Sequence, residues 1–146
     1  MRALVQRVSQ AAVDVEGDRV AQIGPGMVVL LGVGVGDGEE ECDRLVEKVR
    51  ALRVFDDAEG RMNELLGDRE VLCVSQFTLY GDARRGNRPS YVGAARPEVA
   101  EPLYDRFCER LGAKKGVFGA CMGVALINDG PVTLMLEIPP ASEPRA

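Results

Sequence analysis

The sequence of 146 residues contains no histidine at all. Histidine is the side chain whose unperturbed pKa lies nearest neutrality, and it is the usual base of Ser-His-Asp and Cys-His relays. Its absence excludes both relays, together with every zinc site that needs a histidine ligand. If the protein is a hydrolase, another group must handle its protons.

Two further absences bear on location. No apolar run approaches the ~18 residues of a membrane span, and residues 1–7 are too polar for the core of a signal peptide. The cysteines at positions 42, 73, 108 and 121 form no Cys-x-x-Cys pair, so we interpret them as small core residues in a reducing compartment. The sequence therefore predicts a cytoplasmic protein without membrane attachment, metal or other cofactor.

Composition favours an ordinary globular protein, with 46% hydrophobic and 28% charged residues. A chain of this length is about the size of one domain. We therefore expect residues 1–146 to form a single domain, in which residues 139–146 are a flexible tail.

The charge is unevenly distributed. A net charge of −5 argues against binding nucleic acid over the whole surface, because such binding depends on contacts with many phosphates. Residues 83–97 nevertheless contain four arginines and no acidic residue: Arg84, Arg85, Arg88 and Arg96. This segment is either a local site for a polyanion or a solvated loop, and charge alone leaves both readings open.

Apolar patterns indicate more strands than helices. Strand patterns fall at residues 3–8, 12–16, 20–23, 27–33, 70–80, 120–127 and 132–138, with a hairpin turn at Gly17 and Asp18. One amphipathic helix is expected after Asp37, as N-cap of a capping box with Glu40. A second is expected within residues 97–112, with its regular part starting at Pro102. Together these patterns predict an α+β fold.

Three motifs have more than one reading. The glycine-rich residues 32–38 lack a glycine at the sixth position of a dinucleotide-binding fingerprint, so we interpret them as a strand-to-helix connection. Residues 75–79 (Ser-Gln-Phe-Thr-Leu) put polar side chains in an apolar strand, either bonded to nearby backbone or on the floor of a pocket. The Gly130-Pro131 bond can be cis or trans, and the sequence does not decide which.

Four separated motifs together resemble those of D-aminoacyl-tRNA deacylases: residues 75–79, 85–90, 118–122 and 128–133. Residues 6–8 and 55–63 also fit that family. The resemblance implies a homodimeric enzyme with a barrel-like sheet and two main amphipathic helices. It also implies hydrolysis of the ester that links D-amino acids, and glycine mischarged on tRNA-Ala, to the 3′-terminal adenosine of tRNA, with L-aminoacyl-tRNA rejected.

The resemblance assigns a role to each motif. Ser75, Gln76, Phe77 and Thr78 are implied to line the catalytic pocket. Phe118 and Met122 are implied to form its adenosine-side wall. No protein general base is implied, because the 2′-hydroxyl of the tRNA's terminal ribose helps to activate water while backbone amides stabilise the oxyanion.

Selectivity is implied to come from the partner subunit. Gly130 and Pro131 match a Gly-cisPro motif that enters the other subunit's pocket and excludes L-amino acids, and Arg7 matches the arginine that orients this turn. Arg85 and Arg88 are implied to contact tRNA near its acceptor end.

Two other functions compete with this reading. One is a non-catalytic nucleic-acid-binding dimer that uses the arginines from Arg84 to Arg96. The other is a conventional acyl hydrolase with Thr78 as nucleophile, which would need an activating base that no histidine can supply.

Overall fold

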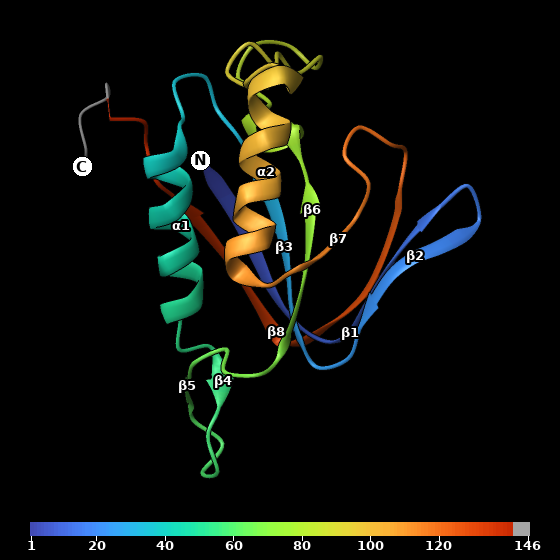
Figure 1. Cartoon of the computed structure of the whole chain (residues 1–146), viewed down its shortest axis with the longest axis vertical. Coiled ribbons are helices and arrows are strands. Elements are labelled where there is room, and N and C mark those ends of the chain that lie inside the picture. Colours follow the sequence, from blue (N-terminus) through green and yellow to red (C-terminus); the bar gives the residue numbers. More distant parts are fainter. Residues whose placement is uncertain (142–146) are drawn as a thin grey trace.

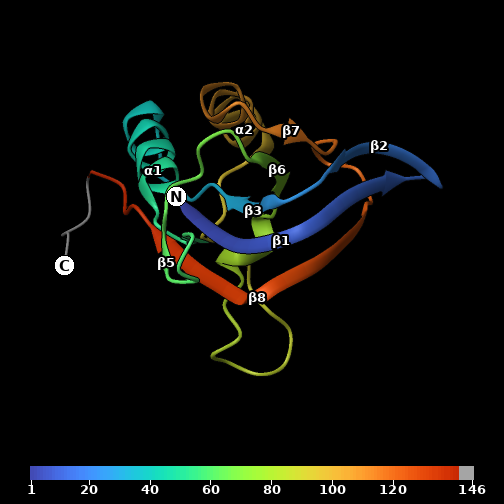
Figure 2. The ribbon, with the colours of Figure 1, turned by 90° about the horizontal axis from the view of Figure 1, so that it is seen from below.

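The structure, a computed structural model, describes residues 1–141, and one strongly curved sheet forms its centre (Figure 1). The strands of this sheet are β1 (Arg2–Val15), β2 (Asp18–Ile23), β3 (Gly26–Gly32), β6 (Glu70–Ser75), β7 (Lys114–Lys115) and β8 (Gly123–Glu137). A separate hairpin comprises β4 (Phe55–Asp56) and β5 (Met62–Glu64). Two helices, α1 (Glu39–Ala51) and α2 (Pro97–Leu111), lie side by side over one face of the sheet (Figures 1 and 2).

The order of the strands brings the two ends of the sheet close together. It runs β2-β1-β3-β6-β7, with β8 on the other edge of β1. The Lys114 ammonium on β7 donates a hydrogen bond of 3.0 Å to the Gln22 carbonyl on β2, so the last strand comes back towards the first. The sheet is therefore nearly closed and barrel-like, and the prediction of an α+β fold with such a sheet and two helices is confirmed.

The apolar run from residue 27 explains why β3 lies at the centre. Successive side chains of a strand point to opposite faces. Met27, Val29 and Leu31 pack beneath the helices, whereas Val28 packs with Leu72 on the other face. A strand that is buried on both faces needs this continuous apolar sequence.

Two strands are longer than predicted. The segments 3–8 and 12–16 belong to the single strand β1, and the segments 120–127 and 132–138 contribute to the single strand β8. The reason is that β1 and β8 pair with each other from Arg2↔Glu137 to Asp14↔Gly123. The hairpin turn is also one residue earlier than expected, since Glu16 and Gly17 have the positive φ values of +51° and +83° that such turns require.

The helix starts also differ from the predictions. Gly38, not Asp37, is the N-cap of α1, and the Glu41 carboxylate accepts a hydrogen bond of 3.1 Å from its amide. Asp37 instead accepts a bond of 2.7 Å from the Gly34 amide and forms an ion pair of 2.9 Å with the amino group of Met1.

The second helix begins at Pro97 and contains Pro102 in its interior. A proline at the first helical position is favourable, whereas Pro102 removes one hydrogen bond, at a cost of about 3 kcal/mol. Burial of apolar side chains offsets this cost, because Leu103, Tyr104 and Phe107 on the same helix are all buried.

Two sequence predictions concern the ends and the surface of the chain. In the predicted tail, the amide of Ala141 donates a hydrogen bond of 2.9 Å to the Glu41 carboxylate, and residues 142–146 lie outside the described residues. Across residues 1–141, no helix combines the length and the apolar character needed to cross a membrane.

Candidate active site

A pocket of about 590 Å³ opens where β6 ends. Its wall is formed by the end of β6, the start of α2 and the loop that follows β7. The lining residues are Val33, Val74, Ser75, Gln76, Phe77, Tyr91, Ala94, Ala95, Pro97, Ala100, Phe118, Gly119, Ala120, Met122 and Val124. Five residues predicted from the sequence are thereby brought together: Ser75, Gln76, Phe77, Phe118 and Met122.

The chain changes direction at the pocket, which the strand pattern did not predict. Parallel pairing with β3 ends at Leu31↔Ser75, and the amide of Gln76 donates a last hydrogen bond of 2.8 Å to the Leu31 carbonyl. A 3₁₀ turn, η1 (Phe77–Tyr80), then follows. The expected strand over residues 70–80 therefore stops at Ser75, and the predicted alternation of side chains beyond it is wrong.

Glycines at the end of β3 make this turn possible. A Cβ at Gly34 would lie 2.7 Å from ring atoms of Tyr80, and one at Gly32 would lie 3.2 Å from Leu79 and Tyr80. Real Cβ atoms rarely or never come so close. The glycine-rich segment is a strand-to-helix connection, as expected, and its glycines leave room for η1 to pack against the backbone of the chain.

Arg2 holds η1 from the opposite side. Its guanidinium donates a hydrogen bond of 2.9 Å to the Leu79 carbonyl, lies 4.5 Å from the centre of the Tyr80 ring and pairs with Glu137. Burial and the nearby Asp37 carboxylate raise the pKa of Tyr80, so its phenol remains neutral. Sequence reasoning missed Arg2, because nothing local marks an N-terminal arginine as a contact of residue 79.

The polar side chains of the motif bond to each other. The Gln76 amide donates to the Thr78 hydroxyl, so Thr78 takes its partner from a side chain and not from nearby backbone. Thr78 is exposed and is not among the lining residues. Phe77 is 56% exposed and packs edge-on against Tyr91, with ring centres 5.1 Å apart.

The opposite wall is formed by residues 116–122. Met122 folds back over this loop, and its sulfur accepts a contact of 3.4 Å from the Val117 amide. Gly116 allows this, since a Cβ there would lie 2.8 Å from the Met122 sulfur. Phe118 packs against the buried Tyr104, whose hydroxyl donates a bond of 2.8 Å to the Cys73 carbonyl on β6.

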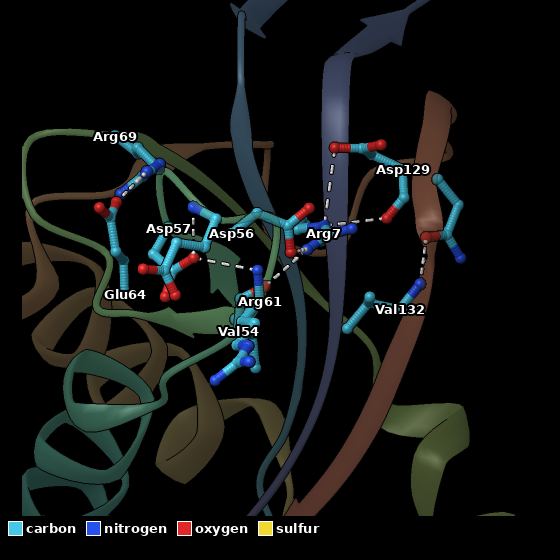
Figure 3. Close-up of polar contacts among 11 residues, drawn as sticks. Arg7, Val54, Asp56, Asp57, Arg61, Glu64, Arg69, Asp129 and Val132 are labelled. Atoms are coloured by element: carbon cyan, nitrogen blue, oxygen red, sulfur yellow. Dashed lines mark hydrogen bonds and ion pairs between the residues drawn. The ribbon is translucent and has the colours of Figure 1, made fainter.

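Residues 129–132 protrude from β8 as a turn, far from the pocket of the same chain. On β1 only Arg7 separates Gln6 from Val8, whereas these four residues separate their partners Thr133 and Asn128 on β8. The side chain of Asn128 closes the neck, because it donates 2.9 Å to the Thr133 hydroxyl and accepts 3.0 Å from the Val132 amide (Figure 3). The Gly130-Pro131 peptide bond within this turn is cis.

Arg7 packs beneath the turn and is only 8% exposed. Its Nε donates a hydrogen bond of 3.0 Å to the Asp129 carbonyl, and its Nη2 would lie 2.9 Å from a Cβ at Gly130 (Figure 3). Arg2 and Arg7 lie five residues apart on β1, about 17 Å along a strand. Neither Gly130 nor Pro131 lines the pocket of its own chain.

The arginine-rich loop forms a third region, between η1 and α2 (Figure 1). Arg84 pairs with Asp82 through contacts of 2.9 and 2.7 Å, and this arginine lowers the pKa of Asp82 to about 2. Arg85 and Arg88 lie around the same shallow depression and have no acidic partner within residues 1–141. They are therefore the free cations of this depression, while Arg84 is neutralised.

The chemistry of the pocket follows from its lining. It contains hydroxyl, amide, phenol and apolar groups but no carboxylate, ammonium or guanidinium. Among the described residues, no three or more Cys, Asp or Glu side chains come together as a group that could hold a metal ion. Fold and site thus define the class: a small α+β protein with a neutral pocket at the end of a parallel strand pair and a separate turn mounted on an arginine.

Comparison with known proteins narrows this class to one family. A model described as D-Tyr-tRNA(Tyr) deacylase matches residues 4–137, and the chain belongs to this family. A D-aminoacyl-tRNA deacylase of Myxococcus xanthus (strain DK1622) is 54% identical over 152 residues, covering 99% of each chain. A protein of the same name from Symbiobacterium thermophilum is 57% identical over 144 residues, covering 94% of this chain and 95% of the relative.

Solved structures show the same fold. A structure titled c-Myc DNA Unwinding Element Binding Protein has a TM-score of 0.90 and 42% sequence identity, and the match covers 95% of this chain and 99% of that one. A structure titled as a probable eukaryotic D-amino acid tRNA deacylase has a TM-score of 0.81 over 94% of this chain and 98% of the other. Its sequence identity is 19%, so it supports the fold alone.

Proposed function

We propose that this chain hydrolyses the ester between a D-amino acid and the 3′-terminal adenosine of tRNA, in a site completed by a second copy of the chain. The reaction is the one for which its relatives of 54% and 57% identity are named. The enzyme is thus a hydrolase of carboxylic esters that acts in translation quality control, and we place it in the cytoplasm. Glycine mischarged on tRNA-Ala is a second expected substrate.

The observation that carries the proposal is the neutral lining of the pocket. Hydrolysis of an ester needs an activated water and a stabilised oxyanion. The lining supplies hydroxyl and amide groups but no carboxylate or amine, so it favours a mechanism in which the substrate's own 2′-hydroxyl helps to activate water. Backbone amides near Ser75, Gln76 and Phe77 would stabilise the oxyanion, and positioning contributes the rest.

Thr78 is less well suited to the role of nucleophile. Its hydroxyl accepts a hydrogen bond from the Gln76 amide, whereas a nucleophile needs a base that accepts its proton. No base is found near it among the lining residues. We therefore assign to Thr78 and Gln76 the positioning of the substrate, together with Phe118 and Met122 on the adenosine side.

A second copy is favoured by the exposed face and edge of β8. This strand pairs only with β1 within residues 1–141, and Ile127, Leu134 and Met135 on it are between 38% and 53% exposed. Long apolar edges of this kind are normally covered. An isologous interface pairs the same surface of both copies, so it could place Gly130 and Pro131 of one copy near Val124 and the pocket of the other.

In this arrangement the turn selects the substrate. The backbone of Gly130 and Pro131 would occupy the space that the side chain of an L-amino acid needs, while a D-amino acid or glycine fits. Arg85 and Arg88 would contact tRNA phosphates at the rim, which is compatible with a net charge of −5 because only a local region is basic.

The competing function, a non-catalytic nucleic-acid-binding dimer, is less favoured. The related structure titled a DNA unwinding element binding protein keeps it in view. However, Asp82 neutralises Arg84, which weakens the cationic surface that tight binding of free nucleic acid would need. The named relatives also favour the deacylase.

The direct test is incubation with D-Tyr-tRNA, L-Tyr-tRNA and glycyl-tRNA-Ala. We expect rapid release of D-tyrosine and glycine and little release of L-tyrosine. Equal release of both tyrosine enantiomers, or release of neither, would refute the proposed function. Tight, salt-sensitive binding of uncharged RNA without hydrolysis would instead support the competing function.

A further inference from the structure

The guanidinium of Arg7 is held from two sides (Figure 3). On the side of the protruding turn, its Nε donates to the Asp129 carbonyl and its Nη2 lies against Gly130. On the other side, its Nη1 donates bonds of 2.9 Å to the Val54 carbonyl and 3.2 Å to the Asp56 carboxylate. Arg7 therefore connects the turn to the β4–β5 hairpin.

A buried cation of this kind needs charge compensation, because removal from water penalises it unless it is paired and hydrogen-bonded. Two carboxylates approach Arg7. The Asp129 carboxylate, at 3.6 Å, belongs to the turn itself, so it moves with the part that is to be held. The Asp56 carboxylate, at 3.2 Å, comes from outside the turn.

The hairpin that carries Asp56 is well anchored. Phe55, its neighbour in β4, is buried in the main core, and the guanidinium of Arg69 lies 4.4 Å from the centre of the Phe55 ring. Arg69 also forms an ion pair of 2.9 Å with Glu64 on β5 (Figure 3). Asp56 is therefore a fixed reference point, although its own side chain is 53% exposed.

The adjacent Asp57 serves a different purpose. Its carboxylate accepts bonds of 2.9 and 3.0 Å from the amides of Glu59 and Arg61, within the hairpin's own turn (Figure 3). It makes no printed contact with Arg7 in the described structure. The two neighbouring aspartates, identical in type, thus provide a natural comparison between a residue that contacts Arg7 and one that does not.

We propose that Asp56 is a positioning residue that orients Arg7, and through it the Gly130-Pro131 turn, for the discrimination between D- and L-aminoacyl esters. This inference rests on the proposed role of that turn and adds a residue for which the resemblance implied no role. Asp56 acts at a distance from the ester, through the guanidinium. Its loss leaves the Val54 carbonyl as the anchor of Arg7 on the hairpin side, which permits the guanidinium and the turn to shift.

The test compares Asp56→Ala and Asp56→Asn with the matched control Asp57→Asn, which keeps the acceptor oxygen for both amides of its turn. The ratio of the single-turnover rates for D-Tyr-tRNA and L-Tyr-tRNA is measured for each. We expect the ratio to fall about fivefold in Asp56→Ala, the upper range for a partly exposed ion pair, and about twofold in Asp56→Asn, which keeps a neutral acceptor. The release of L-tyrosine should rise in Asp56→Ala, whereas general damage to the fold would lower both rates.

A second readout needs no catalysis. Hydrogen exchange of the Arg7 Nε proton, followed by NMR, should be slow in the wild type and in Asp57→Asn and faster in Asp56→Ala. An unchanged exchange rate or an unchanged ratio in Asp56→Ala would overturn the positioning role, as would an equal effect of Asp57→Asn. Absence of hydrolysis by the wild type would instead refute the proposed function, and the exchange measurement would still report whether Asp56 holds Arg7.

Discussion

At the end of β6 the chain packs backbone against backbone, whereas at residues 128–133 it holds a protruding turn with one buried cation. The first region depends on the absence of side chains at Gly32 and Gly34 and yields a pocket without charged lining residues. The second depends on hydrogen bonds and ion pairs of Arg7. The contrast shows that one region provides shape and the other provides orientation, and that neither is a complete stereoselective site by itself.

Loss of the cation is expected to have the largest effect. Arg7→Met removes three hydrogen bonds of the guanidinium and should lower the free energy of unfolding by about 2 to 4 kcal/mol. The D-to-L rate ratio should fall by more than tenfold, because the turn loses its support. Urea denaturation and single-turnover assays measure the two effects. A ratio that stays at the wild-type value would show that the turn does not depend on Arg7.

The pocket end should respond to crowding and not to charge. Gly34→Ala places a Cβ 2.7 Å from the Tyr80 ring, and we expect a loss of about 1 to 3 kcal/mol in the free energy of unfolding. Because η1 must shift, D- and L-ester hydrolysis should fall together. Gly123→Ala is the matched control, since nothing lies within 4 Å of a Cβ there. Equal stability of the two variants would contradict the packing argument.

A smaller effect is expected behind the pocket wall. Tyr104→Phe removes the hydrogen bond to the Cys73 carbonyl and should lower the free energy of unfolding by about 1 kcal/mol. The ring and its contact with Phe118 remain, so the D-to-L rate ratio should not change. A changed ratio would mean that selectivity also depends on this wall, which would weaken the distinction between the two regions.

The smallest effect concerns thiol chemistry. Cys42, Cys73 and Cys108 are buried whereas Cys121, beside the pocket, is exposed. Burial raises the pKa of Cys42 to about 12, so at pH 8 it remains a protonated, unreactive thiol, because a raised thiol pKa means less thiolate at any lower pH. Titration of the native protein with a thiol reagent should detect one fast thiol, and a Cys121→Ser variant should detect none. Several fast thiols would show a more open core.

Part of the fold was predictable because its signals are local. The continuous apolar run in β3 and the apolar periodicity of α1 and α2 each report on the burial of their own segment. The end of β6 was not predictable in this way. Whether the chain continues as a strand after Ser75 depends on the space above Gly32 and Gly34, some 40 residues earlier in the sequence.

The candidate site divides along the same line. Ser75, Gln76, Phe77, Phe118 and Met122 were found through their motifs and lie together at the pocket. Arg2 and Asp56 were missed as contributors, because each acts through a contact with a distant segment. Asp37 shows the same limit on a smaller scale, since its bond to the Gly34 amide and its ion pair with Met1 take it away from the helix cap that spacing predicted.

The most direct measurement uses doubly tagged heterodimers of a pocket variant, Phe77→Ala, and a turn variant, Gly130→Ala, each inactive as a homodimer. Gly130 has φ +128°, a conformation that only glycine adopts readily, so alanine should displace the turn. If pocket and turn act across subunits, each heterodimer contains one intact site, and D-Tyr-tRNA hydrolysis should recover to about half the wild-type rate per dimer. Heterodimers as inactive as either parent, or a chain that sediments as a stable monomer, would contradict the account.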